Sequence, residues 1–208
     1  MKYELQNILS GESGSSHDAI IQAVAHHLRT SQRTSPMAEE KHQNKGKETE
    51  KLIDFAAKNK LFRSDIEEEK YISEGAEQKV YIKDSQYVFK INDAIYYASW
   101  EDYFHNLLLH NYFFADTAYQ LMGFYLKEEK LYAVVKQPFV KADALTNLSD
   151  IKVFLNNNGF ENTKNYDYHH PQLGVILEDL HDENVLTYKG LLYFIDTVFY
   201  IDSNVFWA

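Results

Sequence analysis

The sequence contains no cysteine, so disulfide bonds and metal sites built from thiolates are excluded. It has no apolar run close to the about 20 residues that a membrane-spanning helix needs. Its N-terminus, Met-Lys-Tyr-Glu-Leu, has neither the apolar stretch nor the cleavage site of a secretory signal. These absences indicate a cytoplasmic protein that does not bind a membrane.

Positive charge is also scarce, with 21 Lys and Arg against 31 Asp and Glu and a net charge of −10. This balance disfavours direct binding to nucleic acid or to an anionic membrane. It permits a nucleotide–magnesium complex, which needs carboxylates as well as cations. The hydrophobic fraction of 45%, rich in Tyr and Phe, is ample for a packed core. The 208 residues allow one ordinary domain with extra segments, or two small lobes.

The first part of the chain, residues 1–48, is predicted to form a helical arm and a polar linker. Asp18 is placed to cap a helix whose apolar residues recur at helical spacing from Ile20 to Leu28. The sequence is polar and charged from about Arg29 to Thr49, which is typical of a linker or a loosely held arm.

Residues 49–137 change from a helical to an alternating pattern. A helix is expected at about 48–59 and another, strongly apolar, at about 94–115. Short strands are expected at 71–73, 79–82, 87–91, 121–126 and 131–135. The predicted order is therefore three strands, one helix and two strands.

Residues 138–208 are expected to be mainly helical, with a helix from Ser149 to about Asn156 and a loop after Gly159. The exception is a β-hairpin, because two apolar runs flank the turn signal Lys189-Gly190. A tight turn places Tyr188 opposite Leu191, and pairing outward then places Asn184 opposite Ile195.

This register predicts that Asn184 and Asp196 emerge side by side at the open end of the hairpin, with Asp179 on the loop before it. Magnesium prefers oxygen ligands, and a carboxylate, an amide oxygen and substrate phosphates supply them. A second carboxylate can accept the proton of an incoming hydroxyl. A solvated polar loop is the alternative, but the matching Ile-Asp at the hairpin end favours phosphoryl transfer.

The loop Asp179-Leu-His-Asp-Glu-Asn184 resembles the catalytic loop of the protein-kinase-like superfamily, and its Asp-Leu-His form resembles the aminoglycoside and choline kinase branch. From about Lys51 to Ile201 the chain resembles the serine/threonine/tyrosine kinase domain of bacterial polyvalent proteins, which mobile genetic elements encode. The phrases that carry this resemblance are Glu-Gly-Ala-Glu-Gln-Lys-Val-Tyr, Tyr-Ala-Ser-Trp-Glu-Asp-Tyr, Val-Val-Lys-Gln-Pro-Phe-Val and Leu-Glu-Asp-Leu-His-Asp-Glu-Asn-Val-Leu.

The resemblance implies an α+β, protein-kinase-like fold. Its N-lobe, residues 49–137, would be a five-stranded antiparallel sheet with one helix. Its C-lobe, residues 138–208, would be truncated and mainly helical, and would carry the hairpin. ATP and magnesium would be the cofactors. Asp179 would be the catalytic base, Asn184 and Asp196 would hold metal, and His181 would lie behind them or simply bond to backbone.

In such an N-lobe Lys90 would contact the ATP phosphates, although a strand lysine can also point to solvent. Glu101 would be its acidic partner if the following helix begins near Asp93. If Ser99 is instead the N-cap, with Asp102 completing a capping box, Glu101 lies in the first turn and only favours the helix dipole.

Further contacts to the nucleotide follow from the same resemblance. Gly75 stands in the turn where a phosphate-covering loop belongs, and Val80 is placed to cover the adenine. Gln137 and Phe139 flank Pro138 in a segment that resembles the hinge between lobes. Their backbone groups would contact adenine, or the segment is only a strand end.

The sequence departs from the family pattern in three places. The family's His-Arg-Asp reads Leu-Glu-Asp179, Asp196 is followed by Thr-Val instead of Phe-Gly, and only a dozen residues follow Asp196. We therefore expect no activation segment and no standard peptide-binding helices. The histidine pairs His26-His27 and His169-His170 lack acidic residues at ligand spacing, so no zinc site is expected.

Three functions remain open at this point. The first is an ATP- and magnesium-dependent kinase acting on a hydroxyl acceptor, which is an unknown protein or small molecule. The second is a catalytically weak nucleotide-binding pseudokinase or interaction module of a mobile genetic element. The third is a small-molecule kinase of the aminoglycoside/choline kinase type.

Overall fold

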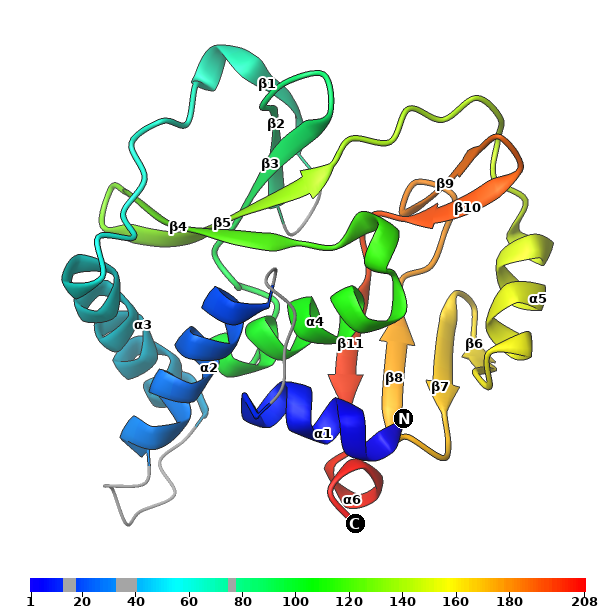
Figure 1. Ribbon diagram of the computed structural model, residues 1–208, viewed down its shortest axis with the longest axis horizontal. Coiled ribbons are helices and arrows are strands. Elements are labelled where there is room, and N and C mark those ends of the chain that lie inside the picture. Colours follow the sequence, from blue (N-terminus) through cyan, green and yellow to red (C-terminus); the bar gives the residue numbers. More distant parts are fainter. Residues whose placement is uncertain (13–17, 33–40, 75–77) are drawn as a thin grey trace.

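The computed structural model describes residues 1–12, 18–32, 41–74 and 78–208 (Figure 1). Its helices are α1 (Lys2–Ser10), α2 (Ala19–Gln32), α3 (Lys41–Lys58), α4 (Trp100–Phe113), α5 (Leu148–Asn157) and α6 (Ser203–Phe206), with short 3₁₀ turns η1 (Glu68–Lys70) and η2 (Ala115–Thr117). Its strands are β1 (Tyr71–Glu74), β2 (Gln78–Ile82), β3 (Tyr87–Asn92), β4 (Gln120–Lys127), β5 (Lys130–Pro138), β6 (Glu161–Lys164), β7 (Asp167–His170), β8 (Val175–Glu178), β9 (Val185–Tyr188), β10 (Leu191–Phe194) and β11 (Val198–Ile201). No helix among these described stretches is long and apolar enough to cross a membrane.

The first sheet has five antiparallel strands in the order β1-β2-β3-β5-β4. The predicted order of three strands, one helix and two strands is confirmed. On one face, Phe89 and Ile91 of β3 pack with Tyr81 and Val134 in a small separate cluster. Because side chains alternate along a strand, Lys90 points to the opposite face, toward the C-terminal half of the molecule.

The helix after β3 is shorter than the predicted span of 94–115, because α4 begins only at Trp100. The backbone N–H of Ala94 donates to Oδ1 of Asn92, and Ala94 adopts a positive φ of 55° that a helix cannot contain. Ser99 is the N-cap, and its hydroxyl accepts from the backbone N–H of Asp102. Glu101 therefore lies in the first turn of α4.

The N-terminal helices pack on α4 and belong to the main core (Figure 1). Helix α2 matches the predicted apolar spacing. The polar stretch expected as a linker from Arg29 to Thr49 is narrower, since α2 runs to Gln32 and α3 starts at Lys41. The remaining part of that expected linker, residues 33–40, lies outside the described residues. The buried apolar side chains of α1 and α2 are Leu5, Leu9, Ile21, Val24, Ala25 and Leu28.

The expectation of a mainly helical C-terminal part is wrong. Besides α5 and the short α6, it contains a four-stranded sheet in the order β11-β8-β7-β6. The stretch expected as a loop after Gly159 is the β6–β7 hairpin, in which Asn165 takes a positive φ of 48° at the turn. Tyr168 and His170 alternate into the core, whereas β6 is exposed throughout. A polar strand of this kind carries little periodic signal.

The β9–β10 hairpin is confirmed in its predicted register, with Tyr188 opposite Leu191. Lys189 and Gly190 have positive φ values of 51° and 75°, which is typical of the type I′ turn that matches the twist of a hairpin. At the open end, the backbone N–H groups of Ile195 and Asp196 both donate to the carbonyl of Asn184, at 2.9 and 3.2 Å. The fold thus brings Asn184 and Asp196 side by side.

Candidate active site

Lys90 is the centre of the contacts between the first sheet and the hairpin. Its side chain is buried, and Nζ donates to the carbonyl of Ile195 at 2.7 Å and lies 3.8 Å from Oδ2 of Asp196. Burial lowers the pKa of Lys90, and the neighbouring Asp196 carboxylate opposes this shift. The alternative that Lys90 points to solvent is therefore wrong.

Gln78 also holds the carboxylate of Asp196. Its Nε2 donates at 2.6 Å to Oδ2 of Asp196, the same oxygen that lies near Lys90, and Gln78 is 9% exposed. The sequence analysis did not select Gln78. Its one available signal was its place within residues 75–80, the segment that was matched to the phosphate-covering loop.

The segment that carries Asp196 is fixed by buried hydrogen bonds from α4 and the residues after it. The Tyr119 hydroxyl donates to the carbonyl of Ile195 at 2.9 Å, and the Thr117 hydroxyl donates to the carbonyl of Phe194. Further on, Nδ1 of His110 lies 2.7 Å from the Thr197 hydroxyl. Burial lowers the pKa of His110 to about 3, so this contact is made by a neutral imidazole.

The amide of Asn184 is directed toward Asp179. Its Nδ2 donates to the backbone carbonyl of Asp179 at 2.8 Å and to Oδ2 at 3.0 Å. Its oxygen, Oδ1, is therefore on the other side of the amide. His181 lies between the two, with Nε2 3.4 Å from Oδ1 of Asp179 and 3.1 Å from Nδ2 of Asn184.

Asp179 itself has a positive φ of 64°, which few non-glycine residues adopt although Asp and Asn tolerate it best. Its backbone N–H donates to Oδ1 of Asp167 at 3.2 Å, and its side chain is 58% exposed. The turn thus presents the Asp179 carboxylate to solvent beside Asn184. An outlier of this kind is compatible with a functional position.

Glu101 does not partner Lys90. Its carboxylate pairs with Arg29 of α2 at 3.1 Å and lies 3.7 Å from His105, one turn along α4. The physical reason is the late start of α4: with Ser99 as N-cap, Glu101 is in the first turn and faces α2. The expected Lys90–Glu101 pair is therefore wrong, and the alternative with Ser99 as the N-cap holds. Among the described residues, the carboxylate that forms an ion pair with Lys90 is that of Asp196.

The residues expected to contact the adenine are only partly brought to this site. Val80 is paired with Lys90 across β2 and β3, which places both on the same face of the sheet. Gln137 is buried within β5, and its side chain donates to the carbonyl of Thr117 at 2.8 Å. The backbone N–H of Phe139 donates to the carbonyl of Gln86 at 2.7 Å. This N–H is therefore not free to contact adenine, contrary to the expectation. Gly75 lies outside the described residues.

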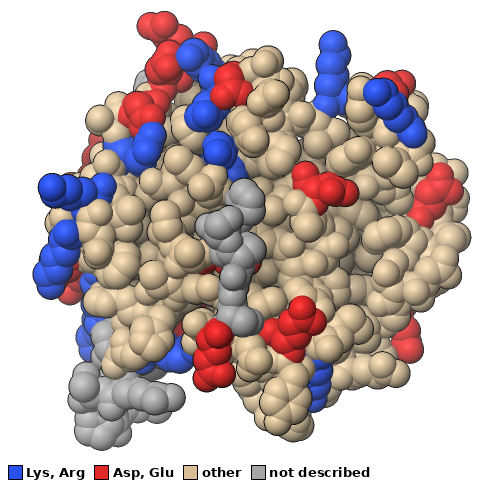
Figure 2. All heavy atoms as spheres, in the orientation of Figure 1, with Lys and Arg blue, Asp and Glu red and all other residues tan. Residues whose placement is uncertain are grey.

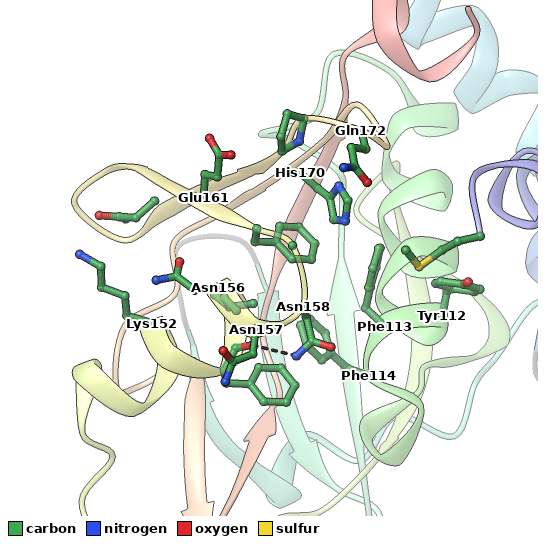
Figure 3. A pocket seen from close by; sticks show the side chains of 17 residues that line it. Tyr112, Phe113, Phe114, Lys152, Asn156, Asn157, Asn158, Glu161, His170 and Gln172 are labelled. Carbon is green, nitrogen blue, oxygen red and sulfur yellow. Dashed lines mark hydrogen bonds between the residues drawn. The ribbon is translucent and has the colours of Figure 1, made fainter.

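A large cavity lies away from these residues. It has a volume of about 1090 Å³ and lies between the end of α5, the β6–β7 hairpin and the end of α4 (Figure 3). Phe113, Asn158 and His170 line it, whereas Lys90, Asp179 and Asp196 do not.

In the described part of the chain, no group of three or more His, Cys, Asp and Glu side chains is arranged to hold a metal ion. The set Asn184 and Asp196, with one carboxylate and one amide, needs further oxygen ligands from a substrate.

The sheet and the hairpin thus define a mixed α/β protein in which a buried lysine lies next to a carboxylate at the open end of a hairpin, with the amide of Asn184 beside that carboxylate's backbone. Residues 45–203 match the model of the family described as serine/threonine/tyrosine kinase found in polyvalent proteins, and the chain belongs to that family. Comparison with curated proteins and with solved structures finds no significant match.

Proposed function

We propose that the chain is a phosphotransferase with a protein-kinase-like fold, which transfers the γ-phosphoryl group of ATP to a hydroxyl acceptor and requires magnesium. The observation that carries the proposal is the ion pair between Nζ of Lys90 and Oδ2 of Asp196, at 3.8 Å. It lies next to Asn184, whose side chain is hydrogen-bonded to the Asp179 carboxylate. The order of the five-stranded sheet and the family match support it.

The donor set suits a magnesium–nucleotide complex. Oδ1 of Asn184 and the carboxylate of Asp196 would hold the metal, and both come from the open end of one hairpin. Magnesium usually takes only one or two protein carboxylates and completes its shell with phosphate oxygens and water. When bound, the metal would supply neutralisation of the charge on the transferring phosphoryl group.

The chain's own residues have distinct roles in this proposal. Lys90 exchanges its hydrogen bond with the Ile195 carbonyl for one with a phosphate oxygen, and Val80 covers the base. Asp179 accepts the proton of the acceptor hydroxyl as the new phosphorus–oxygen bond forms and the bond to the leaving ADP breaks. Asn184 keeps the carboxylate of Asp179 in place through Nδ2, and Gln78 does so for Asp196.

A second candidate is a nucleotide-binding module with weak turnover. The position of the Glu101 side chain favours this candidate, because Glu101 pairs with Arg29. Among the described residues, no carboxylate of α4 forms an ion pair with Lys90. A small-molecule acceptor, as the Asp-Leu-His loop suggests, and a protein acceptor both fit the exposed Asp179.

Transfer from γ-labelled ATP, with magnesium and a panel of protein and small-molecule hydroxyl acceptors, tests the proposal. Asp179→Asn and Asp196→Asn should each reduce the rate about 100-fold or more, the usual scale for a positioned base or a charge-stabilising group. Asp182→Asn is the matched control, since Asp182 is an exposed carboxylate of the same loop. Equal activity of all three variants, or binding of ATP without any transfer, would reject the phosphotransferase.

A further inference from the structure

A second hollow, the β10 groove, lies beside the β9–β10 hairpin, between η2, α5 and β10. Its volume is about 650 Å³. Its floor is aromatic: the rings of Phe114 and Phe194 stack with centroids 4.0 Å apart, and Phe154 lies 5.3 Å from Phe194. Gly190 of the turn and every residue of β10 line the groove. It therefore extends as far as Phe194, which is next to the candidate active site.

Large apolar side chains are exposed around the β10 groove. Leu191 is 62% exposed at its turn end and Phe154 is 39% exposed on α5. Single exposed apolar residues are ordinary, but two that line the same apolar hollow are typical of an interaction site. Leu145, Leu148 and Val153 are also exposed nearby in the chain, although they do not line the groove.

Two carboxylates stand on the walls of the β10 groove without a cation. Asp116 of η2 and Asp150 of α5 both line it, and neither side chain makes an ion pair or a hydrogen bond with any described residue. Figure 2 shows acidic side chains over the η2 and α5 regions, with uncharged surface between them. The groove is therefore apolar at its floor and negatively charged at its walls.

The backbone of β10 also faces the β10 groove. The other edge of the hairpin is occupied, because Thr187 of β9 forms a bridge with Ala144. On the β10 side, the carbonyl of Phe194 points outward and accepts from the Thr117 hydroxyl. Since backbone groups of alternate residues point the same way in an antiparallel pair, the N–H and carbonyl of Leu192 also point outward. No described strand pairs with them.

We propose that the β10 groove binds an extended segment of a protein partner that carries apolar side chains together with Lys or Arg. The segment would lie along the outer edge of β10, hydrogen-bond the backbone of Leu192, and place its cations at Asp116 and Asp150. Addition of a strand to an exposed edge, with side-chain pockets for specificity, is a general mode of peptide recognition. That the partner is the phosphoryl acceptor rests on the proposed function, whereas the binding itself does not.

Binding of a short fluorescein-labelled peptide of alternating Val and Lys, followed by anisotropy with the full chain, tests the proposal. Peptides with Glu in place of Lys, or Ser in place of Val, should not bind. Leu191→Ser should weaken binding about tenfold, because a leucine that the peptide covers is lost. The Asp116→Asn/Asp150→Asn double variant should weaken it about three- to tenfold at low salt and less at high salt.

Matched variants separate this site from non-specific attraction to an acidic protein. Leu126→Ser removes an exposed leucine of β4, and Glu50→Gln/Asp54→Asn removes two exposed charges of α3. Both should bind the peptide as the parent chain does. Equal weakening by the control and groove variants, or no binding of any peptide, would overturn the proposal. Concentration-dependent self-association that Leu191→Ser abolishes would assign the groove to a second copy of the chain and overturn it too.

The outcome is separable from that of the proposed function. Asp196→Asn should bind the peptide with the affinity of the parent chain while its phosphoryl transfer is lost. Groove-dependent peptide binding without any transfer would retain the groove and reject the phosphotransferase. Transfer to a protein acceptor that Leu191→Ser leaves unchanged would retain the phosphotransferase and reject the identification of the groove's partner as the phosphoryl acceptor.

Discussion

Lys90 is a buried ammonium group whose surroundings do not fully compensate its charge. It has one carbonyl hydrogen bond and a carboxylate at 3.8 Å. Removing an ion from water costs several kcal/mol unless close partners replace the hydration. A site of this kind is better suited to receive an anionic ligand than to stabilise the fold.

Lys90→Met is expected to reduce phosphoryl transfer about 100-fold or more, because in the proposed function Lys90 is the group that neutralises phosphate charge. The thermal midpoint should change little, since Asp196 is partly exposed and keeps its hydrogen bond from Gln78. Initial rates and thermal unfolding of the same preparations measure both effects. A variant that retains activity would show that Lys90 does not contact the phosphates.

Gln78 provides a second test at this scale. A hydrogen bond to a charged group is worth about 1.5–3 kcal/mol, so Gln78→Leu should reduce transfer about 10- to 100-fold by freeing the Asp196 carboxylate. Gln86→Leu, at an exposed position of the β2–β3 turn, is the control. Equal rates for the two variants would remove Gln78 from the site.

At the scale of elements, α4 is held at its N-terminus by α3. A carboxylate oxygen of Glu48 accepts from the backbone N–H of Trp100 at 2.7 Å, and the Thr49 hydroxyl accepts from the indole N–H at 2.9 Å. Lys45 donates to the carbonyls of Ala94 and Tyr97 in the turn before the helix. Burial raises the pKa of Glu48 to about 7, against the opposing effect of the Trp100 N–H.

This pKa makes the anchor of α4 sensitive to pH. Between about pH 4.5 and 7 the folded state binds more protons at Glu48 than the unfolded state does, so the free energy of unfolding falls as the pH rises through this window. Glu48→Gln keeps an acceptor for Trp100 and cannot ionise. Its stability should equal that of the parent chain below about pH 4.5, and its advantage over the parent chain should grow from pH 5 to pH 8, to about 3 kcal/mol.

Denaturant unfolding at several pH values measures this difference. Glu50→Gln is the control, because Glu50 is exposed on the same helix. A Glu48→Gln variant whose stability relative to the parent chain is the same at pH 5 and pH 8 would show that Glu48 does not ionise in this window.

The elements also show what could be predicted from sequence and what could not. The β9–β10 hairpin was predictable because two apolar runs surround Lys189-Gly190, and its register then placed Asn184 beside Asp196 correctly. The β6–β7 hairpin was missed because Glu161–Lys164 is polar and exposed, and only pairing with β7 makes it a strand. The direction of Glu101 depended on one local choice of N-cap, and the contact of Gln78 with Asp196 joins residues far apart in the chain.

At the scale of the molecule, the fold extends beyond the family match, which begins at residue 45. Helices α1 and α2 lie before it and cover α4, and their apolar residues are part of the same core as the sheets. Each buried leucine, isoleucine or valine contributes about 1.5–3 kcal/mol, and whole domains are stable by only about 5–15 kcal/mol. These helices therefore belong to the folding unit.

A chain that begins at residue 45 is accordingly expected to lose cooperative folding, because the face of α4 that α1 and α2 cover becomes exposed. Thermal unfolding followed by circular dichroism, with size-exclusion chromatography for aggregation, measures this. Removal of Met1 and Lys2 alone is the control. A shortened chain that unfolds at the temperature of the full chain would contradict the prediction.

The central claim is that Asn184 and Asp196 from the hairpin and Lys90 from the sheet together hold a magnesium–nucleotide complex. Calorimetric titration with ATP, with and without magnesium, measures this most directly. We predict binding by the parent chain that depends on magnesium, and loss of that dependence in Asn184→Ala and Asp196→Ala while both variants remain folded. Magnesium-dependent binding that is unchanged in both variants would contradict the account.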